Sequence, residues 1–182
     1  MLRFNLIVAV CENFGIGIRG DLPWRIKSEL KYFSRTTKRT SDPTKQNAVV
    51  MGRKTYFGVP ESKRPLPDRL NIVLSTTLQE SDLPKGVLLC PNLETAMKIL
   101  EEQNEVENIW IVGGSGVYEE AMASPRCHRL YITQIMQKFD CDTFFPAIPD
   151  SFREVAPDSD MPLGVQEENG IKFEYKILEK HS

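Results

Sequence analysis

The sequence has almost no histidine, and its cysteines do not form pairs. Only His128 and His181 occur in 182 residues, so a Ser-His-Asp or Cys-His catalytic set and a histidine-based metal centre have no obvious members. None of the four cysteines forms a CxxC pair, which argues against zinc and for a reducing compartment. We therefore expect no metal site.

The chain also lacks a strong excess of charge of one sign. With 25 acidic against 23 basic residues, its net charge is -2, so no overall field favours nucleic acid or an anionic membrane. No apolar run reaches transmembrane length, and the N-terminal stretch has no small-residue cleavage pattern. We expect a cytoplasmic protein, a monomer by default, without nucleic-acid or membrane partners. Any anion must then be held by a local site.

Short apolar runs rich in β-branched residues dominate the first two thirds of the chain. The runs at 6–11, 48–51, 70–74, 87–89 and 109–112 are typical of central strands that are covered on both faces. Helical spacing occurs between them, at 26–37, 93–103 and 117–123. A strand at 129–136 and an Asn169-Gly170 turn before 171–178 indicate antiparallel pairing near the C-terminus.

The length of 182 residues fits a single domain, residues 1–182. The alternation of strands and helices predicts an α/β fold. We expect a central, mostly parallel twisted sheet with flanking helices and an antiparallel C-terminal hairpin.

One acidic residue lies on the apolar side of the first predicted helix. Ile26, Leu30 and Phe33 repeat at helical spacing, and Glu29 shares their stripe. An isolated buried carboxylate costs several kcal/mol or shifts its pKa, so Glu29 must be matched by a partner or leave the apolar face. Glu29 is therefore a candidate site residue. The alternative is a glutamate at the edge of the stripe that turns its carboxylate into water.

Two predicted strands end in segments suited to phosphate groups. After 109–112, glycines lead into a helix whose free N–H groups can bind a pyrophosphate, unless they only make a tight turn. After 48–51, Gly52 is followed by Arg53, Lys54 and Thr55, which suit a phosphate monoester or are a solvated basic pair. The two turns together favour a dinucleotide with a third phosphate. With one carboxylate for proton transfer, they favour a hydride-transfer reductase.

The order and spacing of these motifs resemble the dihydrofolate reductase family, from about residue 6 to residue 179. The eukaryotic single-function form is the most similar in length and loop insertions. The motifs are Ile7-Val8-Ala9, Gly15-Ile16-Gly17, Gly20-Asp21-Leu22-Pro23-Trp24, Glu29, Met51-Gly52-Arg53-Lys54-Thr55, Arg69, Val112-Gly113-Gly114-Ser115-Gly116-Val117-Tyr118, Thr133 and Asp142-Thr143-Phe144-Phe145-Pro146.

The resemblance implies reduction of 7,8-dihydrofolate to 5,6,7,8-tetrahydrofolate by NADPH, and inhibition by antifolates. Hydride goes to C6, and a water protonates N5. Glu29 binds the amino-pyrimidine edge of the pterin with help from Thr133, and Trp24 places the water. Leu22 lies on a mobile loop, residues 13–24, that closes over the nicotinamide. The implied catalytic residues are Glu29, Trp24, Leu22 and Thr133.

The resemblance also implies two sets of binding residues. Arg69 binds the α-carboxylate of the glutamyl tail, unless it is only a loop cation. The substrate set comprises Ile7, Val8, Ala9, Glu29, Leu30, Phe33, Val59, Leu66, Arg69, Val112, Tyr118 and Thr133. The cofactor set comprises Ala9, Ile16, Gly17, Gly20, Asp21, Leu22, Gly52, Arg53, Lys54, Thr55, Leu74, Ser75, Thr76, Val112, Gly113, Gly114, Ser115, Gly116, Val117 and Tyr118.

Some positions depart from the family pattern. Thr76, Pro91 and Asn92 stand where relatives often carry a base for the 2′-phosphate of the cofactor. Preference for NADPH then depends on Arg53 and Lys54, with hydroxyls from Ser75 and Thr76, and we expect it to be weaker than usual. Gly58 replaces a serine that is frequent near the nicotinamide.

Two alternatives fit part of this pattern. A pyrimidinone reductase of riboflavin synthesis has the same fold and cofactor, but the joint presence of Trp24, Glu29, Phe33 and Arg69 favours a pterin with a glutamate tail. A folate-binding protein without turnover would not need the glycine turns for a cofactor. Loss of NADPH absorbance with and without dihydrofolate distinguishes the three.

Overall fold

Most of the chain forms one large sheet. The computed structural model describes residues 1–181. The strands of the large sheet follow the order β10-β11-β7-β1-β6-β3-β4-β5, with β9 paired to β11. Their bounds are β1 Phe4–Val10, β3 Gln46–Gly52, β4 Leu70–Leu74, β5 Leu88–Cys90, β6 Val106–Ile111, β7 Cys127–Ile135, β9 Phe152–Val155, β10 Gln166–Glu168 and β11 Ile171–Lys180.

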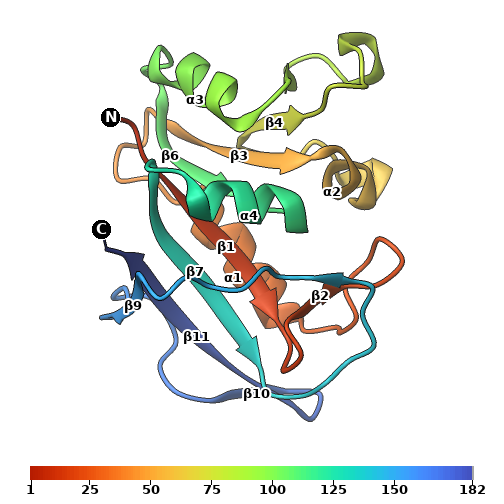
Figure 1. Cartoon of the computed structure of the whole chain (residues 1–182), viewed down its shortest axis with the longest axis vertical. Coiled ribbons are helices and arrows are strands. Elements are labelled where there is room, and N and C mark those ends of the chain that lie inside the picture. Colours follow the sequence, from red (N-terminus) through yellow and green to blue (C-terminus); the bar gives the residue numbers. More distant parts are fainter. Residues whose placement is uncertain (182) are drawn as a thin grey trace.

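The strands from β5 to β7 run parallel, and β11 is antiparallel to β7, β9 and β10. Helices cover both faces of this sheet: α4 lies in front of β1 in Figure 1 and α1 lies behind it. The helices are α1 Lys27–Lys38, α2 Arg53–Gly58, α3 Leu93–Glu101 and α4 Ser115–Ala123, with short 3-10 turns at Glu61–Lys63 and Glu80–Asp82. This is the mostly parallel α/β architecture that the sequence predicts.

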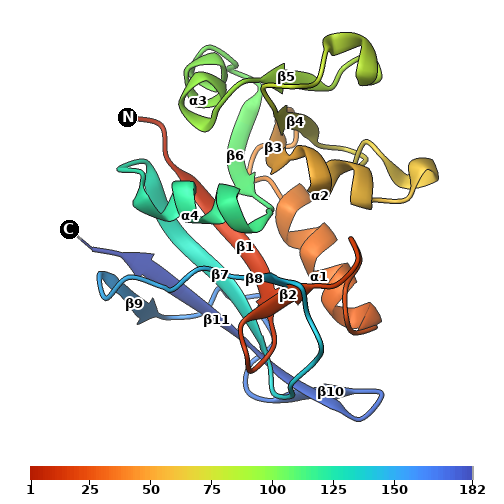
Figure 2. The same ribbon diagram turned by 45° about the vertical axis from the view of Figure 1, so that its right-hand side comes forward.

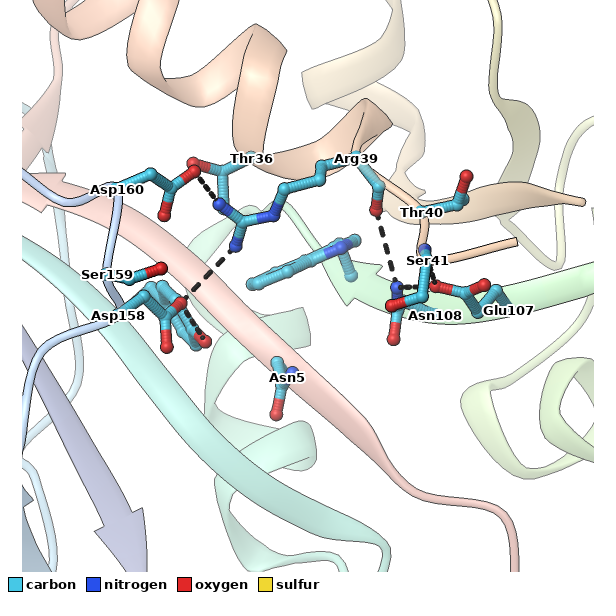
Figure 3. Close-up of a pocket in the computed structure, with 12 residues that line it drawn as sticks. Asn5, Thr36, Arg39, Thr40, Ser41, Glu107, Asn108, Asp158, Ser159 and Asp160 are labelled. Carbon is cyan, nitrogen blue, oxygen red and sulfur yellow. Dashed lines mark hydrogen bonds and ion pairs between the residues drawn. The ribbon is translucent and has the colours of Figure 1, made fainter. Parts of the chain in front are cut away.

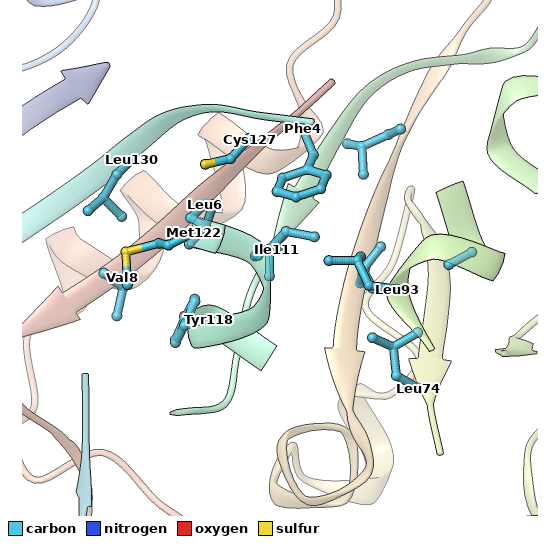
Figure 4. Close-up of a cluster of buried hydrophobic side chains, with 14 of the residues drawn as sticks. Phe4, Leu6, Val8, Leu74, Leu93, Ile111, Tyr118, Met122, Cys127 and Leu130 are labelled. Atoms are coloured by element: carbon cyan, nitrogen blue, oxygen red, sulfur yellow. The ribbon is translucent and has the colours of Figure 1, made fainter. Parts of the chain in front are cut away.

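The two faces of the sheet bury separate apolar clusters because successive strand side chains alternate in direction. From β1, Leu6 and Val8 join the cluster beneath α3 and α4, together with Leu93, Tyr118 and others (Figure 4). Ile7 points to the opposite cluster, which α1 and α2 cover. The runs that the sequence analysis assigns to central strands are therefore covered on both faces, as expected.

The buried face of α1 differs from the expected stripe. Its buried residues are Glu29, Tyr32, Thr36 and Thr37, whereas Leu30 is 51% exposed. The expectation that Leu30 shares the buried stripe is wrong. Tyr32, Thr36 and Thr37 lie on the same side of the helix as Glu29, so the face packed on the sheet is centred on polar side chains rather than on Leu30.

Short strands are the elements that the sequence analysis does not anticipate. The 151–170 region, which has few apolar residues, contains β9 and β10, and β10 completes the predicted hairpin at Asn169-Gly170. A separate two-stranded sheet joins β2 Gly15–Gly17 to β8 Thr143–Phe144, visible side by side in Figure 2. These strands are too short to carry a periodic pattern, so only pairing with a distant segment defines them.

Among residues 1–181, none of the helices combines the length and the apolar character that crossing a bilayer requires.

Candidate active site

Both glycine turns lie at one edge of the sheet, because β3 and β6 are parallel neighbours. Gly52 donates its N–H to the carbonyl of Gly113 at 2.9 Å, and Val112 donates to Val50 at 3.0 Å. The register also pairs Gly52 with Leu74 at the end of β4. The carboxyl ends of parallel strands are where open α/β sheets bind ligands. Three segments far apart in the sequence thus form one edge suited to a nucleotide.

The N-terminus of α4 presents backbone donors at this edge. Its N-cap residue is Gly114, and within residues 1–181 no side chain caps it. Gly113 has φ +121, a conformation that side chains rarely adopt, and a Cβ there would lie 3.4 Å from Thr55 Oγ1. The first N–H groups of a helix have no partner within the helix, and they attract anions. The turn from Gly113 to Val117 therefore fits the pyrophosphate of a dinucleotide.

Three cations line a cavity of about 520 Å³ beside this turn. Arg53 and Lys54, at the start of α2, face Arg19 from the 13–24 loop, and no acidic residue lines the cavity. Gly20, Phe57 and Gly58 complete its lining. Arg19 is not among the site residues predicted from the sequence, although a cation between two loop glycines, Gly17 and Gly20, is a signal that could have identified it. The cavity suits an anionic group.

Gly58 allows the 13–24 loop to approach α2. A Cβ at Gly58 would lie 2.9 Å from the carbonyl oxygen of Gly20, closer than side chains are normally found. A serine at this position would push the two backbones apart. The glycine at residue 58, where relatives often carry a serine, thus allows the loop backbone to lie against α2.

The 13–24 loop is attached to the segment around β8. Arg19 N–H donates to Asp142 Oδ2 at 2.9 Å, and Asp142 N–H donates to the Gly17 carbonyl at 2.9 Å. Beyond this anchor, Gly20, Asp21 and Leu22 are exposed, and Leu22 is exposed to 41%. Ile16 and Gly17 are half-buried next to β8. The loop therefore has a fixed base and an exposed tip.

Glu29 is buried at the N-terminal end of α1. It is 8% exposed, and Thr133 Oγ1 on β7 donates a hydrogen bond to its Oε2 at 3.1 Å. Burial raises the pKa of Glu29 from 4.5 to about 8, and the Thr133 bond only partly opposes this shift. The alternative in which the carboxylate turns into water is wrong. The neighbourhood of Glu29 is low in charge. Burial also raises the pKa of the nearby tyrosines Tyr32, Tyr118 and Tyr175.

A buried donor without a partner belongs to Trp24. Its side chain is 3% exposed and packs edge-on against Phe139 at 5.5 Å between ring centroids. The indole Nε1 has no acceptor within residues 1–181. Because a buried N–H without a partner costs about 1–3 kcal/mol, this atom fits a bound water. The role of Trp24 in placing a water stays a prediction.

Strand β1 contributes Ile7, Val8 and Ala9 to the predicted site. Tyr118 donates its hydroxyl to the Ile7 carbonyl at 2.8 Å, and the tyrosine is buried. This bond fixes the orientation of the Ile7 carbonyl. Val8 is buried, while Ala9 and Val112 are half-buried beside it.

The proposed walls of the substrate site come from α1 and from the segment after α2. Leu30 is exposed, whereas Phe33, Val59 and Leu66 are half-buried. Such part-exposed apolar side chains are available for contact with an aromatic ligand.

Arg69 lies in the turn before β4 and is 8% exposed. Its Nε donates to the Pro67 carbonyl at 2.9 Å and its Nη1 to Thr37 Oγ1 at 2.8 Å. These bonds orient the guanidinium and use two of its five N–H donors. Burial lowers the pKa of Arg69. The assignment of Arg69 to a tail carboxylate stays a prediction.

Ser75 and Thr76 follow β4 at the same edge as Arg53. The Ser75 hydroxyl oxygen accepts bonds from the N–H groups of Thr77 and Leu78, both at 3.1 Å. It is therefore committed to its own turn, and Thr76 is the exposed hydroxyl of the pair. This leaves the cations of α2 as the main groups able to bind a third phosphate.

A second cavity of about 480 Å³ lies at the opposite end of α1 (Figure 3). Arg39 forms ion pairs there with Asp158 and Asp160, and Tyr131 donates to Asp158 at 2.8 Å. Glu107 accepts the N–H groups of Ser41 and Asp42 at 2.7 and 2.9 Å. Its acidic groups are thus paired within the protein, and this cluster joins α1 to the segment before β10.

Fold and site together define an α/β enzyme that binds a nucleotide cofactor beside a buried carboxyl group. The family model for dihydrofolate reductase matches residues 3–180. The chain is 57% identical to dihydrofolate reductase of Aedes albopictus, over 99% of this chain and 98% of the relative. It is 48% identical to dihydrofolate reductase of Sus scrofa, over 98% of each. A solved structure of Schistosoma mansoni dihydrofolate reductase superposes with a TM-score of 0.86 at 39% identity, covering 99% of both chains.

The chain therefore belongs to the dihydrofolate reductase family. It is an oxidoreductase, and membership of the family implies a nicotinamide cofactor.

Proposed function

We propose that the protein reduces 7,8-dihydrofolate to 5,6,7,8-tetrahydrofolate with NADPH. The observation that carries this proposal is the buried Glu29 carboxyl, whose pKa is raised to about 8, next to an edge suited to a dinucleotide. When bound, the reduced nicotinamide supplies a hydride to C6 of the substrate. The residues of the chain then have to bind the ring, orient it and ensure that N5 receives one proton.

Glu29 suits the amino-pyrimidine edge of a pterin. That edge presents parallel N–H donors, which match the two oxygens of a carboxylate. Charge-assisted bonds from these donors favour the ionised form, whereas burial favours the protonated form. Because both forms are accessible near neutral pH, the carboxyl can influence a proton transfer to the substrate. Thr133 keeps the carboxyl in its orientation through the 3.1 Å bond.

We propose that a water held by Trp24 Nε1 delivers the proton to N5. This indole N–H is buried and has no acceptor among residues 1–181. Glu29 would polarise the water and the ring rather than transfer the proton directly. Closure of the 13–24 loop by Leu22 would exclude other water from the nicotinamide side.

NADPH is favoured over NADH by the cations at the start of α2. Arg53 and Lys54 are exposed at the end of β3, beside the end of β4. Guanidinium and ammonium groups bind a phosphate monoester, which NADH lacks. Arg19 adds a third positive charge from the loop. We further propose that the substrate and cofactor sets predicted from the sequence bind dihydrofolate and NADPH, respectively.

The proposal also covers the assembly. We propose one domain over residues 1–182, since a single sheet runs from β10 to β5. We also propose that the protein is a cytoplasmic monomer; the free thiols among residues 1–181 fit a reducing compartment. Antifolates with a diaminopyrimidine edge would bind Glu29 through the same kind of donors as the substrate.

A spectrophotometric assay tests the function. With purified protein, the absorbance of NADPH should fall when dihydrofolate is added. It should stay constant without dihydrofolate. Consumption of NADPH with a pyrimidinone precursor of riboflavin, but not with dihydrofolate, would instead support the pyrimidinone reductase. Tight folate binding without NADPH consumption would support the binding protein.

A further inference from the structure

Two thiols meet where the 13–24 loop leaves the main sheet. Cys11 directly follows β1, Cys141 lies just before β8, and their Sγ atoms are 3.9 Å apart. Cys11 is buried and Cys141 is half-buried. We propose that Cys11 and Cys141 form a thiol–disulfide modification site, which a small disulfide such as oxidised glutathione can close, and that the closed form restricts the active-site loop.

The backbone around the two thiols is already held together. Glu12 N–H donates to the Gln137 carbonyl at 3.1 Å, and Phe145 N–H donates to the Phe14 carbonyl at 2.8 Å. These bonds lie on both sides of Cys141 and directly after Cys11. The segments therefore need no large rearrangement to bring the sulfurs into bonding distance.

Gly15 leaves room beside the pair. A Cβ at Gly15 would lie 2.1 Å from Cys141 Sγ and 3.1 Å from Cys11 Sγ. Because a disulfide is about 2.05 Å long, the sulfurs must approach each other by roughly 2 Å, which side-chain rotation can provide. Cys11 Sγ donates to Asn13 Oδ1 at 2.6 Å, and this bond has to be given up when the disulfide forms.

The exchange proceeds in two balanced steps. The Cys141 thiolate attacks one sulfur of oxidised glutathione, which forms a mixed disulfide and releases one glutathione thiolate. The Cys11 thiolate then attacks Cys141 Sγ, which forms the protein disulfide and releases the second glutathione. The two cysteines lose two protons and two electrons, and oxidised glutathione gains them as two reduced glutathione molecules. Cys141 reacts first because it is the more exposed thiol.

Burial makes this exchange slow at neutral pH. Burial, with smaller contributions from the neighbouring Cys11 and Asp142, raises the pKa of Cys141 to about 11, although a backbone bond at Gly17 opposes the shift. Only a small fraction of Cys141 is then a thiolate, which is the attacking form. The pair is thus stable against brief contact with disulfides and closes during prolonged exposure.

The other two cysteines provide an internal control. Cys90 and Cys127 are buried in the apolar cluster on the opposite face of the sheet, among the residues that α3 and α4 cover. Burial raises the pKa of both thiols. They share the low reactivity of the pair but not its position at the loop base.

The disulfide would tie the segment before β2 covalently to the segment before β8. The small β2–β8 sheet carries the base of the loop, and Leu22 at the tip of the loop has to move for the site to open and close. We expect oxidation to slow hydrogen exchange of the amides in residues 15–22. We also expect kcat for dihydrofolate to fall about 3- to 10-fold with little change in KM. The kinetic part rests on the proposed function, whereas bond formation and amide exchange do not.

The test uses the full reduced chain, incubated with oxidised glutathione and then analysed by peptide mass spectrometry. We expect one peptide pair linked through Cys11 and Cys141, the loss of two of the four free thiols, and recovery with dithiothreitol. The double variant Cys90→Ser, Cys127→Ser should give the same linkage. The variant Cys11→Ser should stop at a glutathione adduct on Cys141.

Two results would overturn the proposal. If the folded parent protein gives only glutathione adducts, or links to Cys90 or Cys127, the pair is not a disulfide site. If the Cys11–Cys141 link forms while amide exchange in residues 15–22 and kcat stay those of the reduced protein, the link does not restrict the loop. Absence of dihydrofolate reduction in both redox forms would refute the proposed function, but it would leave the linkage result intact.

Discussion

Glu29 faces opposing demands of stability and chemistry. Its burial keeps the carboxyl away from water, and Thr133 gives it only one hydrogen bond from the protein. A carboxylate in this position is therefore unfavourable for the fold until a ligand presents donors to it. Such a local cost is common at functional sites, where residues are arranged for the ligand rather than for the folded protein.

The first prediction concerns stability. The folded pKa of Glu29, about 8, is above its ordinary value of 4.5, so the unfolded chain binds fewer protons between these values. Stability should then fall as pH rises through this window. We expect Glu29→Gln, which stays neutral, to be more stable than the parent by about 1–3 kcal/mol at pH 8.5 and equal to it below pH 4.5. Urea unfolding at several pH values measures this difference.

A matched variant controls for general effects of losing a glutamate. Glu120 is exposed on α4, and Glu120→Gln should leave the free energy of unfolding nearly unchanged across the same pH range. If Glu29→Gln is no more stable than the parent at pH 8.5, Glu29 is not held in an unfavourable site.

The second prediction concerns turnover. Glu29→Ala should keep the fold and slow hydride transfer at neutral pH by about 10²- to 10⁴-fold, the usual scale for the loss of proton-transfer assistance. The variant depends on substrate that is already protonated at N5 in solution. Its rate should therefore keep rising as pH falls through the range where the parent has levelled off.

Single-turnover absorbance at several pH values tests this expectation. Binding of NADPH, measured separately, should change less than the rate. A variant whose pH profile runs parallel to that of the parent would show that Glu29 only positions the ring.

At the scale of elements, α2 joins the cofactor edge to the loop. Its first residues follow β3 directly, and its last residue, Gly58, touches the backbone of Gly20. One short helix thus holds the cations near the phosphates and sets how closely the loop can approach. The parallel order β6-β3-β4 decides which turns cooperate, because it brings the ends of these three strands together.

The third prediction tests the cations of this element. Arg53→Ala should weaken NADPH binding by about 1.5–3 kcal/mol, because a charge-assisted bond to the 2′-phosphate is lost. NADH binding should be nearly unaffected. Isothermal titration with both cofactors measures this difference, and Lys98→Ala on α3 serves as the control for removal of an exposed cation. Equal losses for both cofactors would place Arg53 at the shared pyrophosphate or in a structural role.

At the scale of the whole molecule, Arg126 connects three separate parts. It donates to Glu94 at 2.9 Å and to Glu101 at 2.6 Å, near opposite ends of α3, and to the Leu2 carbonyl at 3.1 Å. Its own carbonyl accepts the N–H of Phe4 at 2.9 Å. The start of β1, helix α3 and the turn before β7 therefore meet at one largely buried guanidinium, which is 7% exposed.

The fourth prediction follows from this network. Arg126→Met should lower the free energy of unfolding at pH 7 by about 1–2 kcal/mol, since its partners are partly exposed and can be hydrated when the arginine is lost. The Arg126 bond lowers the pKa of Glu94, so its contribution is present above pH 4.5 and disappears as pH falls through the lowered pKa.

The difference between parent and variant should therefore shrink under acid conditions. Chemical unfolding at pH 7 and pH 3.5 tests this, and Arg153→Met, at an exposed position on β9, is the control. A difference that stays constant between the two pH values would mean that Arg126 contributes through packing rather than through its ion pairs.

The sequence by itself determined the longer elements and the family. Apolar runs such as 70–74 and 109–112 gave strands, Asn169-Gly170 gave the hairpin, and the order of the motifs gave the dihydrofolate reductase resemblance. These signals are local, since the period of a strand or the glycine requirement of a turn is encoded in neighbouring residues. Glu29 was identified for the same reason, because its position on the helix conflicts with its charge.

Only the tertiary structure decided the state and the partners of these residues. The pKa of Glu29 depends on burial and on Thr133, more than a hundred residues away, and Leu30 lies outside the buried face although its spacing places it on the stripe. The contribution of Arg19 to the cationic cavity and the meeting of Cys11 with Cys141 depend on how the 13–24 loop packs against α2 and β8. Burial and distance between remote segments arise from packing, which no local pattern in the sequence records.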